Sequence, residues 1–86
     1  MKHASPETLN ELAAVLARLR TIEGLVERSP GVFYRKSKPF LHFHEDPRGL
    51  FVDVRFRTED DFTRLPVTTS RQQSSLVHRI ERALSQ

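Results

Sequence analysis

The sequence predicts an α+β fold: an N-terminal helix, an antiparallel meander of three or more strands and a C-terminal helix, with the helices packed on one face of the sheet. Apolar residues recur every three or four positions near both ends of the chain, and β-branched and aromatic residues crowd its middle. Turn-forming residues separate the middle segments. With 86 residues the chain has room for one core, so residues 1–86 are expected to form a single domain.

The first helix is predicted over residues 5–28, SPETLNELAAVLARLRTIEGLVER. Ser5 can cap its N-terminus, Pro6 suits its first turn, and Glu7 complements the helix dipole. The sequence SPG at residues 29–31 ends it. One face of this helix is apolar and is expected to pack into the core: Leu9, Leu12, Leu16, Leu19, Ile22 and Val26.

The second helix is predicted over residues 68–86, TTSRQQSSLVHRIERALSQ. A capping box of Ser70 with Gln73 can start it, and Thr69 with Gln72 is the alternative pairing. No short helix and tight turn precede it, so a helix-turn-helix reader of DNA is not predicted. Its buried face is expected to consist of four residues: Leu76, Val77, Ile80 and Leu84.

Three strands are predicted between the helices, at residues 32–35 (VFYR), 39–45 (PFLHFHE) and 50–57 (LFVDVRFR). A polar turn, KSK at residues 36–38, joins the first two. The acidic segment that follows the third strand contains three apolar residues that can pin it down or add a short edge strand: Phe62, Leu65 and Val67.

The turn DPRG at residues 46–49 decides which face of the sheet the histidines occupy. If all four residues form the loop, His42 lies opposite Asp53, and both His42 and His44 lie on the outer face. If only the last three form it, the register shifts by one residue and both histidines enter the core. Two buried imidazoles would need hydrogen-bond partners that an apolar face does not offer, so we expect the first register.

In that register three side chains that commonly bind metals point the same way: His42, His44 and Asp53. Ring nitrogens of residues two apart on a strand can reach one cation, and a cross-strand carboxylate can add a third ligand. The sequence thus predicts a candidate site for a divalent metal or for acid–base chemistry. The alternative is structural, with the aspartate orienting an imidazole by a hydrogen bond. Three side chains are expected around the cluster: Phe40, Phe51 and Arg55.

The positive charge of the chain is concentrated in its strand region. The net charge is +3, and residues 29–57 hold six basic and three acidic groups, which accounts for the whole excess. Such an excess can attract phosphate or an acidic protein partner, although it can equally keep strand edges soluble. Outward Tyr34 or Phe51 can offer stacking surfaces to a nucleic acid. The candidate residues for nucleic-acid or anion binding are Arg35, Lys36, Lys38, Arg55 and Arg57.

Several classes of function lack their sequence signals. The chain has no cysteine, which excludes disulfides, thiolate zinc sites and cysteine nucleophiles. It has neither a glycine-rich phosphate loop nor a G-x-S-x-G elbow, so we assign no catalytic residue and no organic cofactor. It also has no apolar run long enough for a membrane span or a signal peptide, and a cytoplasmic location is expected.

The segment SPGVFYRKSKPFLHFHEDPRGLFVDVRFR between two helices resembles the small bacterial proteins of the YjbR type. Those proteins have an N-terminal helix, a meandering antiparallel sheet with a G-V…R-K…P-F entry, and a closing helix. The resemblance implies an α+β sandwich in a bacterial protein, with DNA binding suggested for some members, and it carries over no functional residue.

The sequence favours a binding or interaction module over an enzyme. A homodimer is expected because the core is small, the first helix is rich in leucine and the sheet edges are open. The alternatives are the metal or acid–base site described above and nucleic-acid binding through the basic hairpin.

Overall fold

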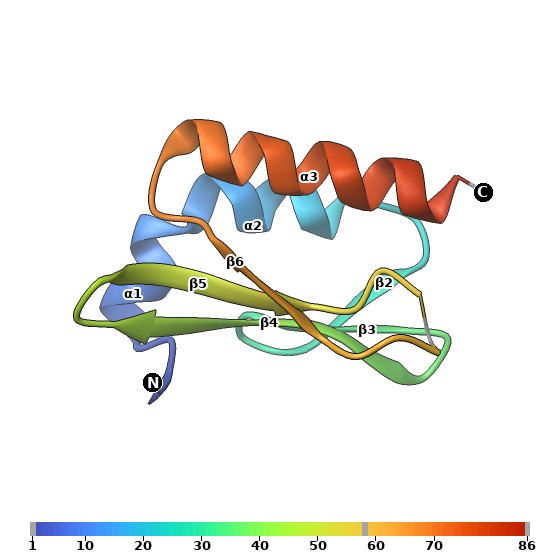
Figure 1. Cartoon of the computed structure of the whole chain (residues 1–86), viewed down its shortest axis with the longest axis horizontal. Helices are drawn as coiled ribbons and strands as arrows, with labels where there is room; N and C mark the ends of the chain where they lie inside the picture. The colour runs from blue at the N-terminus through green and yellow to red at the C-terminus, as the bar shows by residue number, and fades with distance from the viewer. Residues whose placement is uncertain (1, 58, 86) are drawn as a thin grey trace.

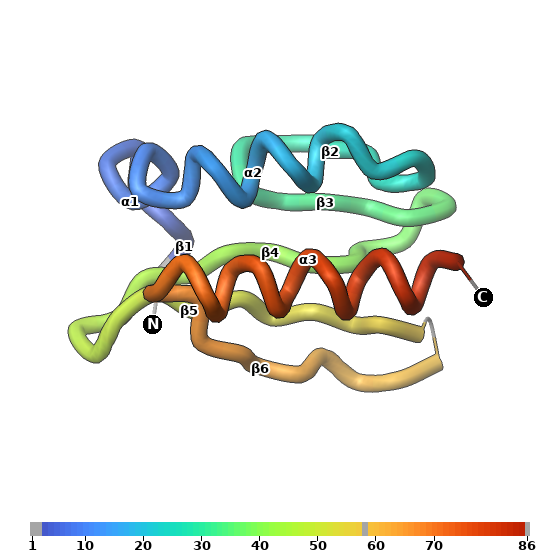
Figure 2. The backbone as a smooth tube through the Cα atoms, turned by 90° about the horizontal axis from the view of Figure 1, so that it is seen from above, coloured from blue at the N-terminus to red at the C-terminus, as the bar shows by residue number. Residues whose placement is uncertain are grey.

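The computed structural model describes residues 2–57 and 59–85 and confirms the α+β fold. Its helices are α1 (Pro6–Glu11), α2 (Ala13–Arg20) and α3 (Ser70–Leu84). Helices α2 and α3 lie on the same side of one antiparallel sheet (Figure 1). Seen from above, α2 lies over β2 and β3, and α3 lies over β4 and β5 (Figure 2). None of the described helices covers the opposite face, which is called the outer face below.

The sheet is an antiparallel meander in the order β2-β3-β4-β5-β6, with the two-residue strand β1 added beside β4. The strands are β1 (Lys2–His3), β2 (Leu25–Ser29), β3 (Val32–Arg35), β4 (Lys38–Asp46), β5 (Gly49–Val54) and β6 (Thr63–Pro66). The three predicted strands correspond to β3, β4 and β5, and the third ends earlier than expected. The acidic segment does supply an edge strand, β6.

The predicted helix over residues 5–28 is correct in its first part and wrong after it. Its N-terminal cap is confirmed, because the Ser5 side chain accepts a hydrogen bond from the backbone N–H of Thr8. Gly24 has a φ of 98°, in the left-handed region that favours glycine and interrupts helical backbone. The chain then forms β2, and Val26 is 57% exposed instead of buried.

Glu27 ties β2 to its neighbours. Its carboxylate accepts hydrogen bonds from the guanidinium of Arg20, at the end of α2, and from the backbone N–H of Gly31 in the following turn. The hydrogen bond from Arg20 is the main reason why the pKa of Glu27 is lowered, and burial opposes it. Local partners of this kind, together with pairing to β3, favour a strand where side-chain spacing alone suggests a helix.

The Glu27 contacts predict a pH-dependent contribution to stability. A pKa that is lower in the folded state stabilises the fold above the unfolded value of about 4.3, and this is lost as the pH falls through the folded value. We expect Glu27→Gln to lower the free energy of unfolding by about 0.5–1 kcal/mol at pH 7, since Arg20 is half exposed and screened. Urea denaturation should show this loss shrinking as the pH falls to 3; a loss that is equal at both pH values would contradict the account.

The C-terminal helix begins with the alternative capping box. The Thr69 side chain accepts from the backbone N–H of Gln72, and the Gln72 side chain accepts from that of Thr69. The favoured pairing of Ser70 with Gln73 is wrong, because Ser70 is already the first helical residue and the Gln73 amide donates to the carbonyl of Val67.

This capping box predicts a contrast between neighbouring hydroxyl residues. Thr69→Ala should lower the free energy of unfolding by about 1 kcal/mol, because it leaves a helix N–H without its acceptor. Ser70→Ala should change it by less than about 0.5 kcal/mol. Thermal denaturation followed by circular dichroism measures both variants, and equal losses would mean that the cap is misplaced.

The core lies between the sheet and the helices. Phe40 was expected beside the histidines on the outer face, but it is 2% exposed and belongs to this core. The reason is a β-bulge: Phe33 pairs with Leu41 while Tyr34 pairs with Pro39, which leaves Phe40 as the extra residue. The buried apolar residues are Leu12, Val15, Leu16, Leu19, Phe33, Phe40, Leu41, Phe43, Val52, Val54, Val67, Leu76, Val77 and Ile80.

Candidate functional site

The β4–β5 hairpin has the register that places both histidines on the outer face. His42 pairs with Asp53 and His44 pairs with Phe51, as predicted. Pairing continues one step further than expected, so the loop consists of residues 47–48 alone. Because side chains alternate along a strand, Phe43 between the two histidines points into the core.

The three predicted ligands come together in the structure. Their ligand atoms, one from each of His42, His44 and Asp53, all lie within 4.8 Å of one another. The Nε2 atoms of His44 and His42 lie 3.0 and 3.6 Å from the same carboxylate oxygen, Oδ2 of Asp53. Asp53 itself is only 9% exposed. The site is thus a small, largely desolvated group of two imidazoles and a carboxylate.

Arg64 of β6 holds the carboxylate from the other side. It is the cross-strand partner of Asp53, and its Nε and Nη2 atoms donate to Oδ1 and Oδ2 at 2.7 and 2.8 Å. This paired hydrogen bond is the main reason why the pKa of Asp53 is lowered, and burial opposes it. The carboxylate is therefore ionised at neutral pH, with both of its oxygens engaged.

A third histidine joins the cluster from β1. His3 pairs with His44 across the strands, and its ring centroid lies 5.4 Å from that of His44 and 6.0 Å from that of His42. The rings of His42 and His44 are 4.5 Å apart. His3 is exposed, so its ring is free of the packing that holds the other two.

The imidazole ring of His44 is buried at an unusual cost. Its side chain is 12% exposed, and both of its ring nitrogens are buried without a hydrogen-bond partner among the described residues. Its Nε2 atom is near Asp53, but the two groups are not aligned for a hydrogen bond. Buried polar atoms without partners typically cost about 1–3 kcal/mol each, so native structures rarely keep them without a reason.

The surroundings of His42 disfavour its charged form. Burial is the main reason why its pKa is lowered; His44 lowers it further, as do His3 and Arg64, while Asp53 opposes them. A neutral imidazole has a free lone pair on one nitrogen, which is the form that binds metals and accepts protons. The ring of Phe62 meets the His42 ring edge to face at a centroid distance of 5.4 Å.

The candidate anion-binding residues are not brought into one cluster. Lys36 and Lys38 are exposed at the β3–β4 turn, where Arg35 pairs with Lys38 across the strands. Arg55 donates to the carbonyl of Pro39, and Arg57 forms an ion pair with Glu59. Of the five, Arg55 is the one that lies close to the histidine cluster, with its guanidinium over the ring of Phe62.

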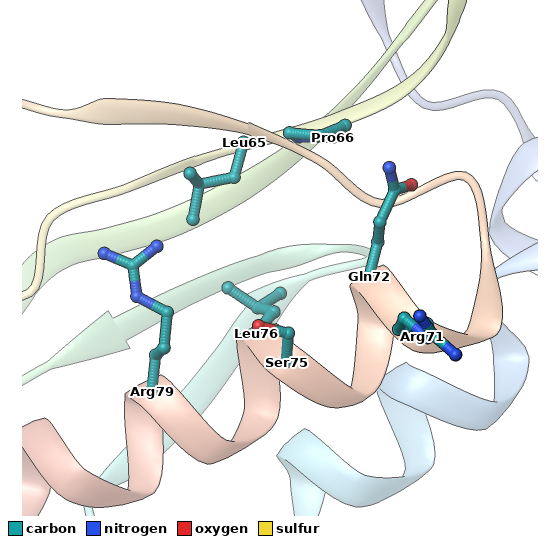
Figure 3. Close-up of a pocket in the computed structure, with 7 residues that line it drawn as sticks. All are labelled: Leu65, Pro66, Arg71, Gln72, Ser75, Leu76 and Arg79. Carbon is teal, nitrogen blue, oxygen red and sulfur yellow. The ribbon is translucent and has the colours of Figure 1, made fainter.

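A shallow groove between β6 and α3 is separate from the histidine cluster and shares no residue with it (Figure 3). In Figure 3 Leu65 and Arg79 lie across the groove from each other, from the strand and the helix respectively. The residues that line it are Leu65, Pro66, Arg71, Gln72, Ser75, Leu76 and Arg79.

Sequence reasoning missed two members of the cluster, His3 and Arg64. A strand of two residues has no periodicity to reveal it, and Arg64 could be placed only after β6 was paired with β5 in the correct register.

No family model, curated protein or solved structure matches the chain. The resemblance to YjbR-type proteins therefore stays a prediction. Among the described helices, none is long and apolar enough to cross a membrane.

Proposed function

We propose that the protein binds a divalent transition-metal ion, with zinc as the reference case, through His42, His44 and Asp53. The observation that carries the proposal is the state of His44, whose buried ring nitrogens have no hydrogen-bond partner among the described residues and lie beside two further ligand groups. Imidazole nitrogens and carboxylate oxygens are ligands that such ions prefer. A bound ion would supply the missing partner of a buried nitrogen.

The alternative, in which the histidines have only a structural role, explains fewer of the observed contacts than metal binding does. In that interpretation Asp53 orients an imidazole by a hydrogen bond. The hydrogen bonds that Asp53 does accept come from Arg64, and His44 is not aligned with the carboxylate for a further one. His42 lies farther away, at 3.6 Å. An arrangement that served only to orient side chains would leave the most buried histidine unsatisfied.

His3 would supply the fourth zinc ligand. Zinc in proteins commonly takes four ligands, and three histidines with one carboxylate are of the required types. The exposed ring of His3 lies next to both other imidazoles, although the atoms that already lie within ligand distance of one another belong to His42, His44 and Asp53 alone among the described residues. Because β1 contributes this ligand, metal binding would also hold the N-terminal strand against β4.

Arg64 would oppose the ion, and this offers a test. Its positive charge repels a cation, and its hydrogen bonds occupy the oxygens that a metal would use. The side chain is 51% exposed, so it can withdraw into solvent. We expect Arg64→Gln to tighten zinc binding about tenfold, because it removes a positive charge beside the ion. Isothermal titration calorimetry on protein without an affinity tag measures this.

Two control variants show whether a change in zinc affinity comes from the charge of Arg64 or from its hydrogen bonds. Arg64→Lys keeps the charge but loses the paired hydrogen bonds, so its zinc affinity should stay closer to that of the wild type. His78→Ala removes an exposed histidine on α3 and should leave the zinc affinity unchanged. A wild-type protein without one zinc site per chain, or zinc binding that weakens in Arg64→Gln, would contradict the proposal.

The homodimer and the cytoplasmic location are kept as parts of this proposal. A chain without cysteines is suited to a reducing compartment, and the outer strands β2 and β6 have open edges that a second copy could pair with. Sedimentation equilibrium of the same samples tests the dimer, and a mass equal to one chain would remove it.

A further inference from the structure

Aromatic rings and guanidinium groups are paired across the outer face of the sheet. Three rings of this face each have an arginine over them, at distances of 4.7 to 5.7 Å from the guanidinium carbon to the ring centroid. The pairs are Tyr34 with Arg28, Phe51 with Arg48, and Phe62 with Arg55.

The strand register places these rings on one surface. Phe51 is the cross-strand partner of His44, and Tyr34 pairs with the exposed Val26. Phe62 contacts the ring of His42. They therefore flank the histidine cluster on the face that no described helix covers (Figure 1). Phe62 is 40% exposed, so part of its ring is open to solvent.

Part of this surface carries unpaired positive charge. Asp46 and Asp53 are each paired with an arginine, Arg48 and Arg64 respectively, while the exposed Asp60 and Asp61 lie in the loop before Phe62. Arg28 forms no ion pair with any described residue. The same holds for Arg55, whose hydrogen bond goes to a backbone carbonyl. The face thus combines unneutralised guanidinium groups with rings, and it fits a flexible polyanion that carries flat groups.

We infer that the outer face binds single-stranded nucleic acid. Unpaired bases can stack on aromatic rings and on guanidinium planes, and arginines can meet the phosphates. In a duplex the base faces are stacked inside the helix, so only the electrostatic attraction between arginines and phosphates would contribute to binding. The rival occupant, a second copy of this chain, would place positive faces against each other. This inference does not depend on the proposed metal site.

Fluorescence anisotropy with labelled 12-mers of oligo(dT) and oligo(rU) tests the inference, and comparing them tells DNA from RNA. EDTA in every sample keeps the metal site empty, so failure here leaves the metal proposal untouched. We expect Tyr34→Leu and Phe51→Leu each to weaken binding about fivefold or more, since they remove a stacking surface. Tyr34→Phe, which keeps the ring, should bind as the wild type does.

The charge contribution has a matched control. Arg28→Gln with Arg55→Gln removes two charges from the outer face, whereas Arg71→Gln with Arg82→Gln removes two from exposed positions on α3. The first pair should reduce the slope of log affinity against log salt by about 1.4, and the second should leave it unchanged. Equal effects of the two pairs, duplex binding as tight as single-strand binding, or a dimer that buries Phe51 and binds no oligonucleotide would overturn the inference.

Discussion

Replacing His44 with alanine is expected to weaken zinc binding by more than about 100-fold, because loss of a supporting residue around a metal already costs 10- to 100-fold and His44 would be a direct ligand. The same change should alter the free energy of unfolding of the metal-free protein by no more than about 1 kcal/mol. The ring loses packing, but two buried nitrogens without partners are removed with it.

Thermal denaturation with and without zinc separates the two effects. A ligand present at 100 times its dissociation constant stabilises the folded state by about 2.7 kcal/mol. Zinc at that concentration should therefore raise the melting temperature of the wild type and of His78→Ala, but not that of His44→Ala. If His44→Ala keeps the zinc-induced stabilisation, His44 is not a ligand.

Replacing Phe43 with alanine is expected to lower the free energy of unfolding by about 3–5 kcal/mol. The ring is 2% exposed, lies against Gly31 and is part of the central strand β4. A chain of this length has about 4–13 kcal/mol of stability in total, so the variant would be close to unfolding. Because Phe43 lies between His42 and His44, its burial is also what turns both imidazoles outward.

Phe62→Ala is the matched control for Phe43→Ala. It removes the same side chain from a position that is 40% exposed, and its cost should be below about 1 kcal/mol. Urea denaturation followed by circular dichroism measures both variants. Equal losses would mean that the core does not centre on β4.

The part of the site that could be predicted from sequence depends on local alternation. Leu50, Val52 and Val54 form an apolar face without a polar interruption, which favoured one hairpin register and placed His42 next to Asp53. The same logic failed where the alternation is interrupted. An extra residue in β4 turns Phe40 into the core. The neighbouring Pro39 is a local signal for such a bulge, because proline in sheets occurs at strand starts, edges and bulges.

The features of the fold and the site that the sequence did not predict depend on contacts between distant segments. The apolar spacing predicted a helix through Val26, but the left-handed backbone at Gly24 ends helical structure and the pairing of β2 with β3 makes this segment a strand. His3 reaches the cluster because β1 pairs with the far end of β4, and Arg64 because β6 pairs with β5. Such pairings depend on tertiary structure rather than on local propensity.

The measurement that tests the metal site most directly is a long-range ¹⁵N–¹H spectrum of the histidine rings, recorded with and without one equivalent of zinc. The proposal predicts that ring-nitrogen signals of His42, His44 and His3 shift together and saturate at one equivalent, while those of His78 on α3 stay in place. Four sets of signals that drift together in proportion to added zinc, or none that move at all, would contradict a shared site on the outer face.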